Sequence, residues 1–339
     1  MKRRKLASTS IAEIGLGCMN LSHAYGVPPA PESARAVLHA GLDLGVDHFD
    51  TAALYGFGRN EELVGAALQP VRQRIFLSSK CGMTGIDGKR VIDGRPDTLK
   101  RTCKESLRRL QSDVIDLYYL HRWDKQVPIE ESVGALAELV REGCIRFVGL
   151  SEVSARTLRR AHAIHPISAV QSEYSLWTRN PELGLLTTCH ELGVALVAFS
   201  PLARGFFAGS VADPRDFVEK DIRRAMPRFQ PPHFGRNRRL LDQFNRLAWE
   251  QGCTPAQLAL AWLLSKSPHI LPIVGTTSGD HLREDVGAAE VQLSAATLEA
   301  LERLINPATV SGPRYAPETL AEIDTEEMPS GECTPINQG

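Results

Sequence analysis

Residues 114–150 read VIDLYYLHRWDKQVPIEESVGALAELVREGCIRFVGL, and this stretch carries the pattern that decides the fold. It begins with an apolar run, 114–120, rich in β-branched and aromatic residues, which is typical of a buried strand. The segment Pro128–Arg141 then places apolar residues at helical spacing, and a second apolar run follows at 145–150. The apolar helical positions are Val133, Leu136, Ala137 and Val140. The stretch predicts a strand, a helix and a strand, the βαβ unit of a parallel sheet.

Apolar runs of the same kind alternate with helical segments along the rest of the chain. They give eight predicted strands in all, at 14–17, 46–49, 74–79, 114–120, 145–150, 169–171, 194–199 and 269–274. A second clear helical segment is Asp97–Leu110, with Asp97 as the expected N-cap after Pro96. Its apolar stripe is Leu99, Cys103, Leu107 and Leu110. Eight strand–helix units predict a single-domain (β/α)₈ TIM barrel, whose usual length is roughly 250 residues.

An open, doubly wound sheet is the alternative architecture. It would carry the dinucleotide fingerprint G-x-G-x-x-G after its first strand. The segment Gly15–Asn20 reads GLGCMN and lacks the third glycine, so the barrel is favoured. We expect the barrel to span residues 1–305. A long loop, Ala203–Asn237, follows the seventh strand, and a proline-rich, partly mobile C-terminal arm occupies 306–339.

The amino-acid composition excludes several classes of protein. The chain has 339 residues, of which 43% are hydrophobic and 23% charged, enough for a large core. Lys and Arg total 39 against 40 for Asp and Glu, a balance that argues against a nucleic-acid or anionic-membrane partner. No apolar run approaches the roughly 20 residues that span a bilayer, and the basic start Lys2–Lys5 is not followed by a signal-peptide core. Seven cysteines without a C-x-x-C motif indicate free thiols and a cytoplasmic protein.

Polar residues recur at the carboxyl ends of the predicted strands, where TIM barrels build their active sites. They are Asp50, Lys80, His121, Ser151, Gln171, Ser200 and the pair Gly275-Thr276. Tyr55 follows Asp50 by five residues in a loop. Each residue alone has a structural explanation, such as an N-cap or a buried polar group. Their recurrence on one face of one barrel favours a site.

Six motifs in this set resemble the aldo-keto reductase superfamily, in the same order and on successive strands. They are Phe49–Gly56 (FDTAALYG), Ser79–Gly82 (SKCG), Asp116–Arg122 (DLYYLHR), Gly149–Glu152 (GLSE), Gln171–Ser175 (QSEYS) and Ala198–Leu202 (AFSPL). The likeness runs from about Leu6 to Ile305. It implies a barrel that binds a nicotinamide dinucleotide without a Rossmann fold, in a soluble, bacterial-type branch that acts on aldehydes and bulky or polycyclic ketones.

The family's catalytic tetrad maps onto Asp50, Tyr55, Lys80 and His121. Carbonyl reduction moves a hydride from nicotinamide to the carbonyl carbon, and the developing alkoxide needs a proton. The resemblance makes Tyr55 the general acid, with the Lys80 ammonium expected to lower the phenol pKa from ~10. Asp50 would hold Lys80 by a charge-assisted hydrogen bond. His121 would donate to the carbonyl oxygen.

The resemblance also implies a cofactor site. Ser151, Glu152 and Gln171 correspond to contacts with the nicotinamide carboxamide, although many members have Asn in place of Glu152. Phe199 falls where an aromatic ring stacks on the nicotinamide. The pyrophosphate loop is represented by Ser200, Leu202 and Gly205.

The segment Gly275–Asp285 corresponds to the site of the adenosine 2′-phosphate. The expected contacts there are Gly275, Thr276, Thr277, His281, Arg283, Glu284 and Asp285. Hydroxyls and backbone N–H groups near a helix start suit an anion. An arginine common in the family is replaced by His281, and Arg283 lies on a different helical face. NADPH is therefore the expected cofactor, with NADH possible but weaker.

One methionine and four aromatic residues near the strand ends are the candidates for a substrate pocket, which would suit bulky, fairly apolar carbonyl compounds. They are Met19, Tyr25, Phe57, Trp123 and Trp177. The long loop is a candidate lid. Its Phe206, Phe207, Phe229 and Phe234 would pack on the cofactor, and its Arg204, Arg228 and Arg236 would meet the phosphates.

The sequence thus predicts an NADPH-dependent reductase of a small carbonyl substrate, acting as a monomer or weak homo-oligomer. The alternative is an NADPH-binding regulatory subunit, like the β-subunits of some channels, with little turnover. A metal-dependent hydrolase would need paired histidine ligands at a strand end. No such pair occurs, because His162 and His165 fall in a helical segment, and we expect no metal site.

Overall fold

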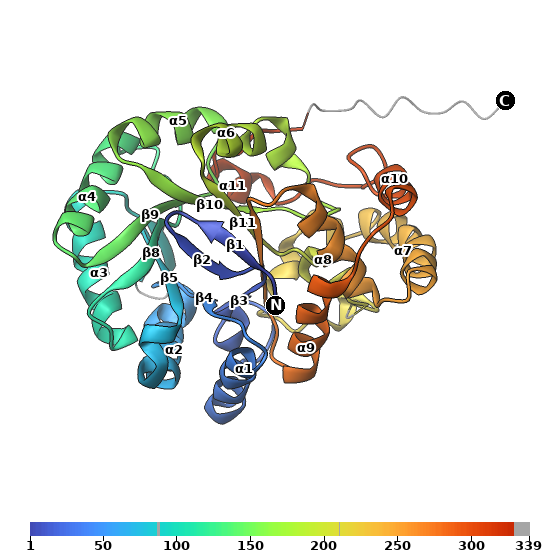
Figure 1. Ribbon diagram of the computed structural model, residues 1–339. Coiled ribbons are helices and arrows are strands. Elements are labelled where there is room, and N and C mark those ends of the chain that lie inside the picture. The colour runs from blue at the N-terminus through green and yellow to red at the C-terminus, as the bar shows by residue number, and fades with distance from the viewer. Residues whose placement is uncertain (87–88, 210, 329–339) are drawn as a thin grey trace.

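The computed structural model describes residues 1–86, 89–209 and 211–328, and its centre is a closed barrel of parallel strands (Figure 1). The barrel strands are β3 (Gly15–Gly17), β4 (His48–Asp50), β5 (Phe76–Cys81), β8 (Ile115–Leu120), β9 (Ile145–Ser151), β10 (Ile167–Glu173), β11 (Ala195–Phe199) and β12 (Ile270–Val274). Strands adjacent in this order pair in parallel, and β12 pairs with β3 to close the ring. The predicted TIM barrel is confirmed, with every predicted strand end within two residues of the observed one.

Helices surround the barrel on its outer side (Figure 1). Those that follow the barrel strands are α1 (Pro31–Asp43), α2 (Arg59–Leu68), α3 (Pro96–Leu110), α4 (Ile129–Arg141), α5 (Ala155–Ile164), α6 (Leu185–Leu192), α8 (Pro255–Lys266) and α9 (Gly279–Gly287). Three more helices stand outside the repeat: α7 (His233–Glu250), α10 (Ala295–Leu304) and α11 (Pro317–Ala321). Among the described residues, no helix is long and apolar enough to cross a membrane.

Two details of the predicted helices differ from the structure. Arg95 is the N-cap of α3, and Asp97 lies in the first turn without capping it, because Pro96 can take the first helical position, where no N–H is needed. The buried face of α4 includes Leu139, whereas Ala137 and Val140 are only partly buried. The helix is rotated slightly toward Leu139, whose larger side chain gains more from burial.

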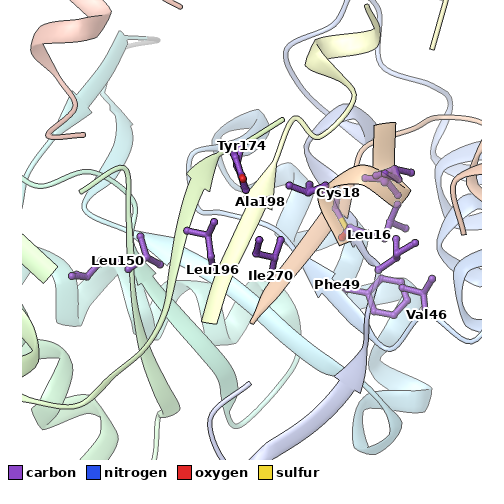
Figure 2. Close-up of a cluster of buried hydrophobic side chains, with 14 of the residues drawn as sticks. Leu16, Cys18, Val46, Phe49, Leu150, Tyr174, Leu196, Ala198 and Ile270 are labelled. Carbon is purple, nitrogen blue, oxygen red and sulfur yellow. The ribbon is translucent and has the colours of Figure 1, made fainter. Parts of the chain in front are cut away.

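Two layers of apolar side chains hold the barrel. The larger cluster lies between strands and helices, and Figure 2 shows part of it around Leu16, Phe49 and Leu196. A smaller cluster fills the barrel interior and includes Leu6 and Ile11. These two residues come from an antiparallel hairpin, β1 (Arg3–Leu6) and β2 (Thr9–Ala12). The hairpin lies across the barrel in Figure 1 and closes the end opposite the carboxyl ends of the strands.

Two insertions shape the face formed by the carboxyl ends. A hairpin of β6 (Met83–Ile86) and β7 (Lys89–Ile92) follows β5. The segment after β11 contains several short 3₁₀ turns, at Ala203–Gly205, Pro214–Asp216, Ile222–Ala225 and Pro227–Phe229. It ends where α7 begins at His233, four residues before the predicted end at Asn237. Its phenylalanines 206, 207, 229 and 234 are buried against one another, and Trp177 packs among them.

The C-terminal segment after α10 packs on the barrel. We refer to its described part, residues 306–328, as the arm. The Asn237 amide donates to the Ser311 carbonyl at 2.9 Å, and the Lys125 ammonium donates to the carbonyls of Ala321 and Ile323 at 2.9 and 2.8 Å. The part of the arm that the structure describes is thus attached at several points. The last residues, 329–339, for which mobility was expected, lie outside the described residues.

Candidate active site

Three predicted tetrad residues meet in a buried charged cluster at the carboxyl ends of β4 and β5. The Lys80 ammonium pairs with one oxygen of Asp50 and donates to the Thr51 carbonyl at 2.7 Å. It also hydrogen-bonds the Tyr55 phenol, whose ring centroid lies 5.0 Å from the Lys80 nitrogen. The Lys80 side chain is fully buried. Such a charge persists in the interior only with a counter-charge and hydrogen bonds, and the site supplies both.

The fourth residue, His121, lies at the end of β8 beside Tyr55. The two ring centroids are 5.7 Å apart in an edge-to-face arrangement. His121 Nδ1 is buried and has no hydrogen-bond partner among the described residues. His23, which sequence reasoning missed, also stacks with Tyr55, with centroids 6.3 Å apart. The phenol is thus held between two imidazoles and one ammonium.

The pKa of Tyr55 differs from the sequence-based expectation of a lowered value. Burial raises it above its ordinary value, and the opposing effect of Lys80 does not cancel that rise. The expected attraction is therefore present but is outweighed by desolvation. As a result, Tyr55 keeps its proton at neutral pH.

The two basic members of the tetrad shift in opposite directions. Burial disfavours the Lys80 charge, yet Asp50 and Tyr55 raise the Lys80 pKa above its ordinary value. Burial lowers the pKa of His121 well below its usual range, and the neighbouring charge of Arg122 adds to that effect. Lys80 is consequently a cation and His121 a neutral imidazole. A neutral imidazole can donate one hydrogen bond to an oxygen without competing for the proton.

The residues expected to hold the carboxamide lie directly beside this cluster. The sheet register places Ser151 of β9 opposite Gln171 of β10. The Gln171 amide donates to the second oxygen of Asp50 at 2.8 Å. Arg122 donates to the Ser151 hydroxyl at 3.2 Å and to the His121 carbonyl at 2.7 Å. Asp50 and Arg122 therefore link the tetrad to the two neighbouring strand ends.

Glu152 takes a different position from the expected one. Its side chain is fully buried and paired with Arg314 of the arm, and its other oxygen accepts from the Ser172 hydroxyl and the Glu173 N–H. Both carboxylate oxygens are therefore occupied by the protein. Spacing alone could not reveal this, because Arg314 is 162 residues away.

The residues after β11 follow the predicted pattern only in part. Phe199, Ser200 and Leu202 are half-buried, and Gly205 has a left-handed φ of 89°. Arg204 is turned toward Glu173, with 2.8 Å between guanidinium and carboxylate, and does not extend outward. Arg228 donates to the carbonyls of Trp177 and Gly312, whereas Arg236 is exposed.

The predicted anion site lies at the start of α9. Ser278, a residue that the sequence analysis did not single out, is the N-cap and accepts from the N–H of His281. The Thr276 hydroxyl accepts from the Ser278 N–H at 3.1 Å. Gly275, Thr277 and His281 are exposed. These groups surround an open helix N-terminus.

The last three predicted residues of α9 point in different directions. Arg283 pairs with Asp280 at 2.9 Å and is exposed. Glu284 is half-buried, whereas Asp285 is buried. Burial raises the pKa of Asp285 to about 7. Asp285 therefore faces the protein interior, in contrast to the sequence-based expectation, because the helix turns its position inward like that of the buried Leu282.

The chain is similar to known proteins along most of its length. The model of the Aldo/keto reductase family matches residues 13–306. The chain belongs to the aldo-keto reductase family. The Schizosaccharomyces pombe protein "Aldo-keto reductase yakc [NADP(+)]" is 42% identical over 335 residues, covering 96% of this chain and 98% of that protein. "Probable aldo-keto reductase 1" of Glycine max is 41% identical over 308 residues, covering 90% and 88%.

Solved aldo-keto reductases share the fold. The glycerol dehydrogenase AKR11B4 of Gluconobacter oxydans superposes with a TM-score of 0.83 at 26% identity, covering 93% of this chain and 98% of that one. The holo form of the Bacillus halodurans aldo-keto reductase AKR11C1 gives 0.74 at 30% identity, covering 90% and 97%. The match to the aldo-keto reductase family therefore extends along most of this chain, from residue 13 to residue 306.

The substrate-pocket candidates of this aldo-keto reductase separate into two groups. Met19 packs against the apolar cluster that includes Tyr55. Phe57, which is 55% exposed, lies against Gly85 of the β6–β7 hairpin and is two residues from Tyr55 along the chain. The other three are held by the protein itself. Trp177 is buried in the aromatic cluster, Trp123 donates to the Val127 carbonyl, and Tyr25 accepts from Arg204.

Proposed function

We propose that this aldo-keto reductase reduces an aldehyde or ketone to the alcohol with NADPH, using Tyr55 as the general acid. The observation that carries the proposal is the protonated, buried Tyr55 phenol held between the Lys80 cation and a neutral His121. Such a group can give a proton to an alkoxide as it forms. The adjacent cation then stabilises the phenolate that remains.

The cofactor proposal rests on the fit of the residues near this cluster. Ser151 and Gln171 offer a hydroxyl and an amide, the groups that can bind a carboxamide. A side chain at Gly275 would lie 3.1 Å from the Asn20 amide, so the bare glycine keeps this surface open. The exposed N-terminus of α9 carries a partial positive charge, which suits a phosphate. When bound, the nicotinamide would supply the hydride.

The chain's own residues then have separate roles in the reduction. Asp50 fixes Lys80, and Lys80 orients the Tyr55 hydroxyl. His121 would donate a hydrogen bond to the carbonyl oxygen and hold it near Tyr55. Tyr55 would transfer its proton to that oxygen. The half-exposed rim of Met19 and Phe57 supports an apolar aldehyde or bulky ketone as substrate.

The test is the variant Tyr55→Phe, which keeps the ring but removes the proposed proton donor. We expect kcat to fall by ~10²–10⁴-fold, the usual contribution of general acid catalysis, while the NADPH dissociation constant stays nearly unchanged. Tyr118→Phe, a change of a buried tyrosine outside the tetrad, is the matched control. Activity would be measured as NADPH oxidation over aldehydes, diketones, quinones and polycyclic ketones.

Two results would count against the proposal. Retention of most activity by Tyr55→Phe would rule out Tyr55 as the acid. Wild-type protein that binds NADPH but turns over no carbonyl compound would favour the regulatory-subunit alternative. We also propose a cytoplasmic location, since the six cysteines among the described residues are free thiols, and we propose that the protein is a monomer or a weak homo-oligomer. In that part of the chain, no cluster of His, Cys, Asp or Glu is placed to hold a metal ion.

A further inference from the structure

The arm places one arginine among the strand ends that border the tetrad. Arg314 is 7% exposed, and its guanidinium pairs with Glu152 and lies 3.5 Å from the Glu173 carboxylate. Glu152 follows the last residue of β9, and Glu173 is the last residue of β10. The arm therefore brings a positive charge to the ends of the two strands that carry Ser151 and Gln171.

Glu152 is held more tightly than a solvent-facing carboxylate would be. Its backbone adopts a left-handed φ of 56°, which costs free energy in a residue other than glycine. Its N–H donates to the Gln171 carbonyl at 2.9 Å, and its own carbonyl accepts from the Asp324 N–H at 3.0 Å. The hydrogen bonds and the Arg314 ion pair hold Glu152 in this unusual conformation. Ser151, the neighbour of Glu152, is thereby fixed as well.

The charges explain why an arginine is needed here. Glu152 and Glu173 are two buried carboxylates, and one oxygen of Glu152 accepts from the Glu173 N–H. Arg204 and the Tyr315 hydroxyl satisfy Glu173 at 2.8 and 3.1 Å. Among the described residues, the only cationic partner of Glu152 is Arg314. Removing one partner of a buried pair leaves a charge without compensation, which is strongly unfavourable.

We propose that Arg314 is a positioning residue for reduction: through Glu152 it fixes the ends of β9 and β10 and hence the groups that receive the cofactor. The inference rests on the proposed function of the tetrad. The path is continuous, because Glu152 bonds to Gln171 through the backbone and Gln171 bonds to Asp50 through its side chain. Loss of Arg314 would displace Ser151 and Gln171 without touching Tyr55 directly.

The first experiment replaces Arg314 by Met in the full chain. We expect NADPH to bind at least tenfold more weakly, and kcat to fall by up to ~10²-fold, the loss that a small misplacement can cause. The matched control is Lys125→Met, which removes another basic side chain that holds the same arm, through the carbonyls of Ala321 and Ile323. The control should leave both constants within twofold of wild type.

The second experiment separates positioning from loss of the fold. Adding Glu152→Gln to Arg314→Met removes the uncompensated charge while keeping an acceptor for Ser172. The double variant should therefore reverse at least half of the change that Arg314→Met causes in the logarithm of the NADPH dissociation constant. Arg314→Lys should fall between wild type and Arg314→Met. Hydrogen exchange of the arm and urea unfolding would be recorded for every variant.

The measured NADPH affinities can either support or contradict the proposed role of Arg314. Rescue by Glu152→Gln, with no effect of Lys125→Met, would support the role of Arg314. Equal losses in the two Met variants, or NADPH binding within twofold of wild type in Arg314→Met, would overturn it. The NADPH titrations do not depend on turnover. They therefore test Arg314 even if Tyr55→Phe shows that the proposed chemistry is wrong.

Discussion

Replacing Lys80 by Met should destabilise the folded chain by about 3–5 kcal/mol. The Lys80 side chain is fully buried, and that of its partner Asp50 is 2% exposed. After the change, the Asp50 carboxylate would keep, among its contacts in the described part of the chain, the hydrogen bond from Gln171 at 2.8 Å, and the Thr51 carbonyl would lose the Lys80 donor. A buried carboxylate with one neutral donor is far from compensated.

Adding Asp50→Asn to Lys80→Met should restore most of that stability. Both charges are then gone, and replacing a buried ion pair by neutral groups of similar volume is often close to neutral. The double variant should nevertheless remain inactive, because the Tyr55 phenol has lost its neighbouring cation. Stability and activity would therefore respond differently to the same pair of changes.

The measurement is urea unfolding followed by circular dichroism, with ΔG compared at constant m. Lys100→Met is the matched control, since Lys100 forms a partly exposed pair with Glu138 that should contribute little to stability. A loss below about 1 kcal/mol in Lys80→Met would refute the reasoning. So would a double variant as unstable as the single one.

Three further predictions follow from individual residues. Burial raises the pKa of Asp285 to about 7, above ~3.9 in an unfolded chain. The free energy of unfolding should therefore fall as pH rises from ~4 to ~7. Asp285→Asn should flatten this part of the pH profile of thermal unfolding and stabilise the chain at pH 8. Trp177→Ala should cost about 3–5 kcal/mol in urea unfolding, because the ring is 5% exposed and contacts Phe206 and Phe229; a loss below 1 kcal/mol would instead favour a free rim residue. NADPH should bind more tightly than NADH in a fluorescence titration because of the anion site at α9, and equal dissociation constants would contradict that assignment.

The barrel could be predicted from sequence because its signals are local and repeated. Each strand is a short apolar run buried on both faces, and helical periodicity marks the segments between them. The predicted N-cap of α3 and the predicted buried face of α4 were wrong, because a neighbouring residue determined each of them. Pro96 took the first position of α3 and left Asp97 without a capping role. Leu139 turned α4 slightly away from the predicted stripe.

The tetrad could be located because its members lie at the ends of neighbouring strands, where topology brings them together. Their ionisation could not be predicted in the same way. The opposing effects of burial and of Lys80 on the Tyr55 pKa depend on how much water the fold excludes. His23 was missed for a related reason, because it lies in a loop and meets Tyr55 only through the tertiary structure.

The contacts of the arm are the clearest case of structure that local sequence patterns could not predict. The sequence predicts an irregular, partly mobile segment over residues 306–339, because several prolines interrupt regular structure there. The same segment delivers Arg314 to Glu152 and Tyr315 to Glu173, two buried carboxylates at strand ends. The buried Glu152 carboxylate needs a positively charged partner, and the structure supplies Arg314, which is 162 residues away in the sequence. Glu152 and Arg314 thus form one buried ion pair, and the role of neither residue can be predicted from the residues next to it in the sequence.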